Sequence, residues 1–165
     1  ISLDIFYNNG WDILHDTDVD ELVETNIARW SNNLHTETIP LARSLVANIS
    51  DFSLKRAGVT PTAFNHHDAR QANIAWHPEH GAKIVDWSWA DAGLSGGDKT
   101  MFLLDLHKSD IDVTHYIGHI NIDYAKLVLG YWLARSNTQH MEGNHQVRMQ
   151  QFISAVKASE LLAQL

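Results

Sequence analysis

Apolar residues along most of this chain recur every three or four positions, which is the pattern of amphipathic helices. The pattern predicts helices from Asp18 to about Leu34, from Pro40 to Gly58, and over residues 98–108, 121–136 and 145–163, with a short one over 111–118. Asp18 is a suitable N-cap for the first helix, and Gly58 is a suitable stop for the second. The fold class is therefore predicted to be α+β and mainly α.

The helical periodicity is interrupted by two short apolar runs around a turn. Ile74–Trp76 and Lys83–Val85 read as strands, and the segment His77–Gly81 between them is rich in turn residues. A β-hairpin is therefore predicted over residues 74–85. Its open end would place Asn73 and Asp86 side by side, about one strand spacing of 5 Å apart.

Asp68 lies five residues before Asn73, on a loop that leads into the predicted hairpin. Two carboxylates and a carboxamide that converge on one point form an all-oxygen site. Mg²⁺ uses such oxygen ligands together with phosphate oxygens. The residues therefore point to Asp68, Asn73 and Asp86 as candidate functional groups.

Composition narrows the class of protein. The chain has 165 residues, enough for about one domain, and a hydrophobic content of 44% with six Trp indicates a packed core. Its net charge of −8 argues against binding to nucleic acid or to anionic membranes, and it is compatible with a cationic substrate. No Cys and no long apolar run occur, so we expect a cytoplasmic location.

The order of these motifs resembles a known enzyme family. His66-x-Asp68-x-x-x-x-Asn73, followed by Ile84-Val85-Asp86-Trp87, is similar to the pattern of aminoglycoside phosphotransferase and choline-kinase-like small-molecule kinases. Gly93 and Gly97-Asp98, with the apolar run after them, resemble the continuation of that pattern. The sequence departs from it at His67, where the family usually has Gly, and over Ala69–Ala72.

The resemblance implies a fold and a reaction. The fold would be a protein-kinase-like C-terminal lobe, with helices packed around the hairpin that carries the catalytic and metal residues. The reaction would be ATP-dependent phosphorylation of a hydroxyl on a small molecule such as an aminoglycoside or choline. Asp68 would act on the acceptor hydroxyl, His66 would brace the catalytic loop, and Asn73 and Asp86 would hold Mg²⁺ on the nucleotide, which Arg70 could also contact.

The resemblance also implies a second lobe, because such kinases cover the phosphates with a glycine-rich turn that does not occur in this sequence. We expect residues 1–165 to form a single C-terminal domain, with residues 1–16 as a linker from the N-terminal lobe. We expect this chain alone to be inactive. An exposed apolar cleft could promote its self-association.

Two other classes compete with the kinase interpretation. His66-His67-Asp68, with His35 and Asp86, could belong to a metal-dependent phosphohydrolase of the HD type. That architecture places its His-Asp pair within a helix, so a continuous helix over residues 66–86 would favour it. A binding module that keeps the lobe without the chemistry is the other alternative, although such a module would be under no constraint to retain Asp68, Asn73 and Asp86.

Overall fold

The computed structural model describes residues 3–139 and 144–165, and they form a mainly helical α+β fold. The longer helices are α3 (Val19–Trp30), α4 (Thr38–Phe52), α5 (Gly97–Lys108), α6 (Ile122–Ser136) and α7 (His145–Leu162). Strands β1 (Ala63–Asn65) and β4 (Asp91–Gly93) form one antiparallel pair, and β2 (Ile74–His77) and β3 (Gly81–Ile84) form another. Short 3₁₀ turns are η2 (Arg56–Gly58), η3 (Gln71–Asn73), η4 (Trp87–Trp89) and η5 (Thr114–His119).

Most of the predicted helices are present, with shifted ends. Asp18 caps α3, because its carboxylate accepts a hydrogen bond of 3.1 Å from the Glu21 backbone N–H. The prediction that the next helix extends to Gly58 is wrong, because α4 ends at Phe52 and Ser53 is extended, with ψ of 137°. The short helix predicted over residues 111–118 is the 3₁₀ turn η5.

The N-terminal segment is part of the packed domain. It consists of α1 (Leu3–Phe6), a π-helical turn η1 (Tyr7–Trp11) and α2 (Asp12–His15). The side chain of Trp11 is 1% exposed, and its indole N–H donates to the Lys126 carbonyl at 3.0 Å. Residues 1–16 were expected to be a linker, and the described part of this segment is instead built into the core. Its connection to a preceding lobe stays a prediction.

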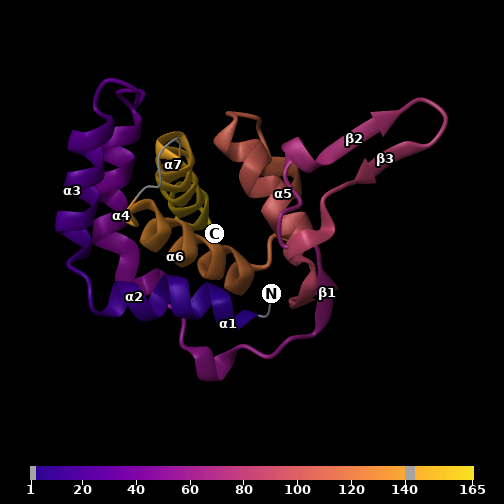
Figure 1. Cartoon of the computed structure of the whole chain (residues 1–165), viewed down its shortest axis with the longest axis horizontal. Helices are drawn as coiled ribbons and strands as arrows, with labels where there is room; N and C mark the ends of the chain where they lie inside the picture. The colour runs from indigo at the N-terminus through magenta and orange to yellow at the C-terminus, as the bar shows by residue number, and fades with distance from the viewer. Residues whose placement is uncertain (1–2, 140–143) are drawn as a thin grey trace.

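Helix α6 is the centre of the core. It runs between α7, the N-terminal helical segment and α5, as Figure 1 shows. Leu127, Leu129 and Leu133 of α6 are fully buried, and so are Phe152 and Val156 of α7. Each buried side chain of this size stabilises the fold by about 1.5–3 kcal/mol relative to exposure. None of the described helices is long and apolar enough to cross a membrane.

The predicted hairpin is confirmed, and a second strand pair accompanies it. The β2–β3 hairpin pairs Ile74 with Ile84 and projects from the helical body (Figure 1). It turns over residues 78–80, and Gly81, with a φ of 69°, begins the returning strand. The β1–β4 pair was not predicted, because three-residue strands are too short to show a recognisable alternation. Gly93 permits this pair, since a Cβ there would lie 1.8 Å from the Asn65 side-chain oxygen.

Candidate active site

The loop of residues 66–70 lies between β1 and η3, and Asp98 holds its backbone. Asp98 is in the first turn of α5. Both of its carboxylate oxygens accept from the His66 N–H at 2.9 Å, and one also accepts from the His67 N–H at 3.1 Å. These are charge-assisted hydrogen bonds, which are stronger than those between neutral groups. Asp98 therefore braces the loop of residues 66–70.

His66 joins this loop to the end of the hairpin. Its ring is fully buried, and Nδ1 accepts a hydrogen bond of 3.2 Å from the Asp68 N–H. The proton therefore resides on Nε2, which donates to the Val85 carbonyl at 2.9 Å. Because both ring nitrogens are engaged, the geometry suits a bracing group better than a catalytic base.

His67 has a backbone conformation that favours glycine. Its φ is 64°, in the left-handed region that glycine adopts without steric cost. The buried ring compensates, since Nε2–H donates to the Ala92 carbonyl at 3.1 Å and Nδ1 accepts from the Tyr124 hydroxyl at 3.0 Å. Burial lowers the pKa of His67 and raises the pKa of Tyr124, so both groups are held neutral.

Asp68, Arg70 and Asn73 converge at the end of the loop. The Asn73 side-chain amide donates to the backbone carbonyl and to the Oδ2 atom of Asp68, both at 2.8 Å. Arg70 donates to both carboxylate oxygens, with Nη2 3.0 Å from Oδ2. The hydrogen bond with Asp68 raises the pKa of Arg70. Arg70, a candidate nucleotide contact, is therefore ion-paired with Asp68 in this structure.

A backbone hydrogen bond of the neighbouring residue Val85 places Asp86 beside Asn73. The Val85 N–H donates to the Asn73 carbonyl at 2.9 Å, so the hairpin ladder continues to its predicted open end. Asp86 has a φ of 60°, and its exposed carboxylate accepts from the Ser88 hydroxyl at 2.7 Å. Among the described residues, no hydrogen bond links the Asp86 side chain to that of Asp68 or Asn73.

The donor set fits a hard cation such as Mg²⁺. The NH₂ group of Asn73 faces Asp68, so its amide oxygen is the end left for a cation, and one oxygen of Asp86 has no hydrogen-bond partner among the described residues. Both are oxygen ligands, the type that Mg²⁺ prefers.

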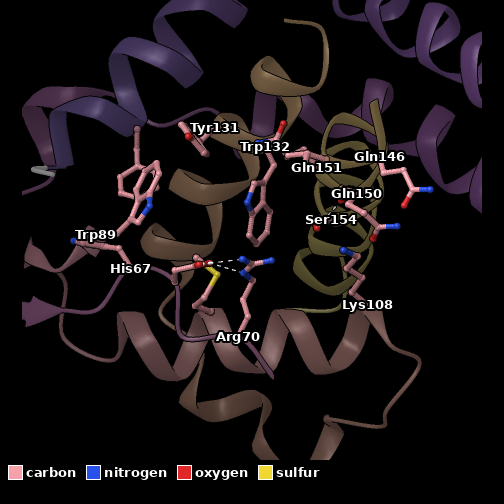
Figure 2. Close-up of a pocket in the computed structure, with 14 residues that line it drawn as sticks. His67, Arg70, Trp89, Lys108, Tyr131, Trp132, Gln146, Gln150, Gln151 and Ser154 are labelled. Atoms are coloured by element: carbon pink, nitrogen blue, oxygen red, sulfur yellow. Dashed lines mark hydrogen bonds and ion pairs between the residues drawn. The ribbon is translucent and has the colours of Figure 1, made fainter. Parts of the chain in front are cut away.

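A cavity of about 430 Å³ opens next to Asp68 and Arg70. Figure 2 shows Arg70 with the other labelled residues that line it. Aromatic side chains form part of its wall, and polar side chains from α5 and α7 form the rest. Its lining comprises Phe6, His67, Asp68, Arg70, Trp89, Met101, Lys108, Tyr131, Trp132, Gln146, Val147, Gln150, Gln151 and Ser154. Sequence reasoning missed the polar residues of α7, although Gln146 and Gln150 are four residues apart on a predicted helix and so share one face.

The helix required by the phosphohydrolase alternative is not present. Residues 66–70 form a loop, followed by η3 and the hairpin, where that alternative needs a continuous helix. In the described part of the chain, three His, Asp or Glu side chains with ligand atoms within 4.8 Å of one another occur at the exposed hairpin turn, as His77, Glu79 and His80. They do not occur around His66 and Asp68, so the structure disfavours the HD-type reading.

Comparisons of the chain with protein families, with curated proteins and with solved structures find no match.

Proposed function

We propose that this chain is the kinase-like C-terminal lobe of a phosphotransferase that transfers the γ-phosphoryl group of ATP to a hydroxyl of a small molecule. The observation that carries the proposal is the pairing of Asp68 with Asn73 on a loop whose backbone is clamped by Asp98, beside a cavity of about 430 Å³. Phosphoryl transfer depends mainly on positioning and charge stabilisation, and a braced loop supplies the positioning.

Asp68 would orient the acceptor hydroxyl and accept its proton. Both of its carboxylate oxygens are engaged by Arg70 and Asn73 in this structure. Proton acceptance therefore requires one of these contacts to open when the acceptor enters. Arg70 is the residue to move, because its side chain is 42% exposed whereas the Asn73 amide is also held by the Asp68 backbone.

Asn73 and Asp86 would hold Mg²⁺ through their side-chain oxygens, as their positions at the open end of the hairpin suggest. ATP bound there would supply the γ-phosphoryl group, and Mg²⁺ would neutralise the charge of its phosphates. His66 would hold the Asp68 loop and the hairpin end that carries Asp86 in a fixed relative position. Its ring bonds to the Asp68 N–H on one side and to the Val85 carbonyl, next to Asp86, on the other.

Exposed apolar side chains around the hairpin support a covering lobe. Phe64 is 67% exposed, Trp76 75%, Val85 47% and Trp87 52%. Exposed apolar groups gathered along one segment are typical of a surface that another part of a protein covers. We propose that a nucleotide-binding lobe covers them, and that this chain without that lobe binds ATP weakly.

Acceptor-dependent ADP release by the full-length gene product tests the proposal. Asp68→Asn should lower kcat by roughly 10²–10⁴-fold and leave nucleotide affinity near wild type, as expected for loss of a positioned general base. Asp86→Asn should weaken Mg²⁺–nucleotide binding as well as turnover. Asp112→Asn is the control, because this carboxylate caps a turn through the Thr114 N–H at 2.9 Å and does not line the cavity.

Two outcomes would contradict the assignment. If Asp68→Asn leaves kcat within a few-fold of wild type, Asp68 is not the catalytic group. If nucleotide binds without turnover of any acceptor, the result favours the alternative of a binding module without catalytic activity.

A further inference from the structure

The cavity beside Asp68 has a charge opposite to that of the whole chain. The sequence contains 20 acidic and 12 basic residues, apart from His. Among the described residues of the cavity wall, however, Arg70 and Lys108 are the cations and Asp68 is the carboxylate, already paired with Arg70. Lys108 therefore leaves a net positive charge in the wall. This is the reverse of what a cationic acceptor requires.

Lys108 is the last residue of α5, and Figure 2 shows its side chain among the polar residues of the cavity. Burial lowers the pKa of Lys108, and the positive charge of Arg70 lowers it further, while Asp105 opposes the shift. Asp105 is itself engaged, because its carboxylate accepts from the Gln71 backbone N–H at 2.8 Å and from the Gln71 amide at 3.1 Å.

Within residues 3–139 and 144–165, Lys108 has no hydrogen-bond or ion-pair partner. A partly dehydrated ammonium beside a second cation is unfavourable until an anion lies between them.

Two further cations act on an aromatic residue of the wall. Arg135 and Arg148 act on the pKa of Tyr131, which lines the cavity, and oppose the rise that its burial causes. Arg70 donates to Asp68 through Nε and Nη2, so its Nη1 group is left for a ligand. The cations that line the cavity, Arg70 and Lys108, therefore favour an anion.

The rest of the wall consists of neutral polar groups and aromatic faces. Gln146, Gln150, Gln151 and Ser154 from α7 offer hydrogen-bond donors and acceptors, and Trp132 adds an aromatic surface (Figure 2). Such walls suit a hydroxylated carbon skeleton, which makes many hydrogen bonds along its edge and packs its C–H groups on an aromatic ring.

We propose that the cavity binds a polyhydroxylated small molecule with one oxyanion, a carboxylate or a phosphate, which lies between Lys108 and Arg70. The assignment of this ligand as the phosphoryl acceptor rests on the function proposed above, whereas the assignment of its negative charge rests on the cavity alone. Polycationic aminoglycosides and choline are then disfavoured, because their ammonium groups would lie against two cations.

A set of probes with one carbon skeleton tests the proposal by calorimetry or ligand-observed NMR on this chain. Glucitol is neutral, gluconate carries a carboxylate, glucitol 6-phosphate carries a phosphate and glucamine carries an ammonium. We expect one of the two anionic probes to bind at least tenfold more tightly than glucitol, and glucamine to bind more weakly than glucitol. The stronger anionic probe identifies the oxyanion.

Variants then assign the effect to the cavity. Lys108→Met, which keeps the apolar stem, should remove the preference for the anion, whereas Lys55→Met, at an exposed lysine outside the cavity, should leave it unchanged. Lys108 also borders a neighbouring hollow lined by Glu37 and Asp110. Gln146→Glu adds a carboxylate to the cavity beside Asp68 and not to that hollow, so it should weaken binding of the anionic probe as well.

Each result bears on the inference. Tighter binding of glucamine, an anion preference that survives in Lys108→Met, or no saturable binding of either anionic probe up to about 10 mM would overturn it. Failure of the proposed function is a separate result: anion binding that depends on Lys108, without ADP release by the full-length protein, would keep the cavity assignment and reject the transferase. Phosphorylation of cationic acceptors alone would support the transferase and reject the assignment of an anionic ligand to the cavity.

Discussion

Replacing Asp98 with Asn tests what positions the candidate site. The carboxylate accepts from the His66 N–H with both oxygens at 2.9 Å and from the His67 N–H at 3.1 Å. An amide of the same shape keeps one acceptor oxygen and turns an NH₂ group toward these donors. A hydrogen bond to a charged group contributes about 1.5–3 kcal/mol, and a residue such as His67 in the left-handed region costs about 1–2 kcal/mol to hold. We therefore expect Asp98→Asn to lower the free energy of unfolding by about 2–4 kcal/mol.

Urea unfolding measures that loss, and amide hydrogen exchange locates it. Exchange of the His66 and His67 amides should accelerate more than exchange within α6. Asp18→Asn is the matched control, because Asp18 also accepts a backbone N–H, at 3.1 Å, but on an exposed N-cap where Asn is about as effective. If Asp98→Asn loses no more stability than this control, or the His66 and His67 amides stay protected, the carboxylate does not hold the loop.

Two further outcomes follow from buried groups. Gly130→Ala should lower the free energy of unfolding by about 1–3 kcal/mol in denaturant titrations, because the new Cβ would lie 2.5 Å from the Trp11 indole; Gly58→Ala, which meets nothing within 4 Å, should cost less than about 1 kcal/mol. The pKa of His67 is lowered by burial, so the stabilisation linked to its neutral form should be fully present above the ordinary pKa of 6.5 and be lost as the pH falls from there toward the lower folded-state value. His67→Gln should remove that part of the dependence of Tm on pH, and an unchanged dependence would show that another group causes it.

Local patterns account for the parts of the fold that could be predicted. The Asp18 cap and the turn over residues 78–80 act within a few residues, so the sequence places α3 and the β2–β3 hairpin closely. The β1–β4 pair joins Asn65 to Asp91 across 26 positions, and its three-residue strands have no pattern of their own. The N-terminal helical segment was missed for a related reason, since the burial of Trp11 depends on a space over Gly130 that exists only in the folded core.

The candidate site also has a part that local sequence patterns predict and a part that depends on the packing of distant segments. Asp68 and Asn73 share one loop, so their spacing was enough to predict that they meet. The ion pair of Arg70 with Asp68 is also local, because it joins residues two positions apart. The position of Lys108 at the cavity wall, by contrast, depends on the packing of α5 and α7, which the sequence does not display. The net charge of the chain also gives the wrong sign for the ligand, because it sums over the whole chain, whereas the cavity wall carries a net positive charge.

The two adjacent histidines explain why the loop has one defined position. His66 bonds through its ring to Val85 at the end of the hairpin, and His67 bonds through its ring to Ala92 of β4 and to Tyr124 of α6. The positive φ of His67 is what allows neighbouring side chains to reach in these two directions. Asp68 follows directly and is thereby fixed between the open end of the hairpin and the cavity against α7. In a phosphotransferase, the hairpin end would be the phosphoryl-donor side and the cavity would be the acceptor side. A Gly at position 67 would keep the backbone turn but lose the hydrogen bonds of the His67 ring to Ala92 and Tyr124. His67→Gly should therefore accelerate exchange of the Asp68 amide while the β2–β3 hairpin stays protected, and equal protection in both would show that Asp98 alone fixes the loop.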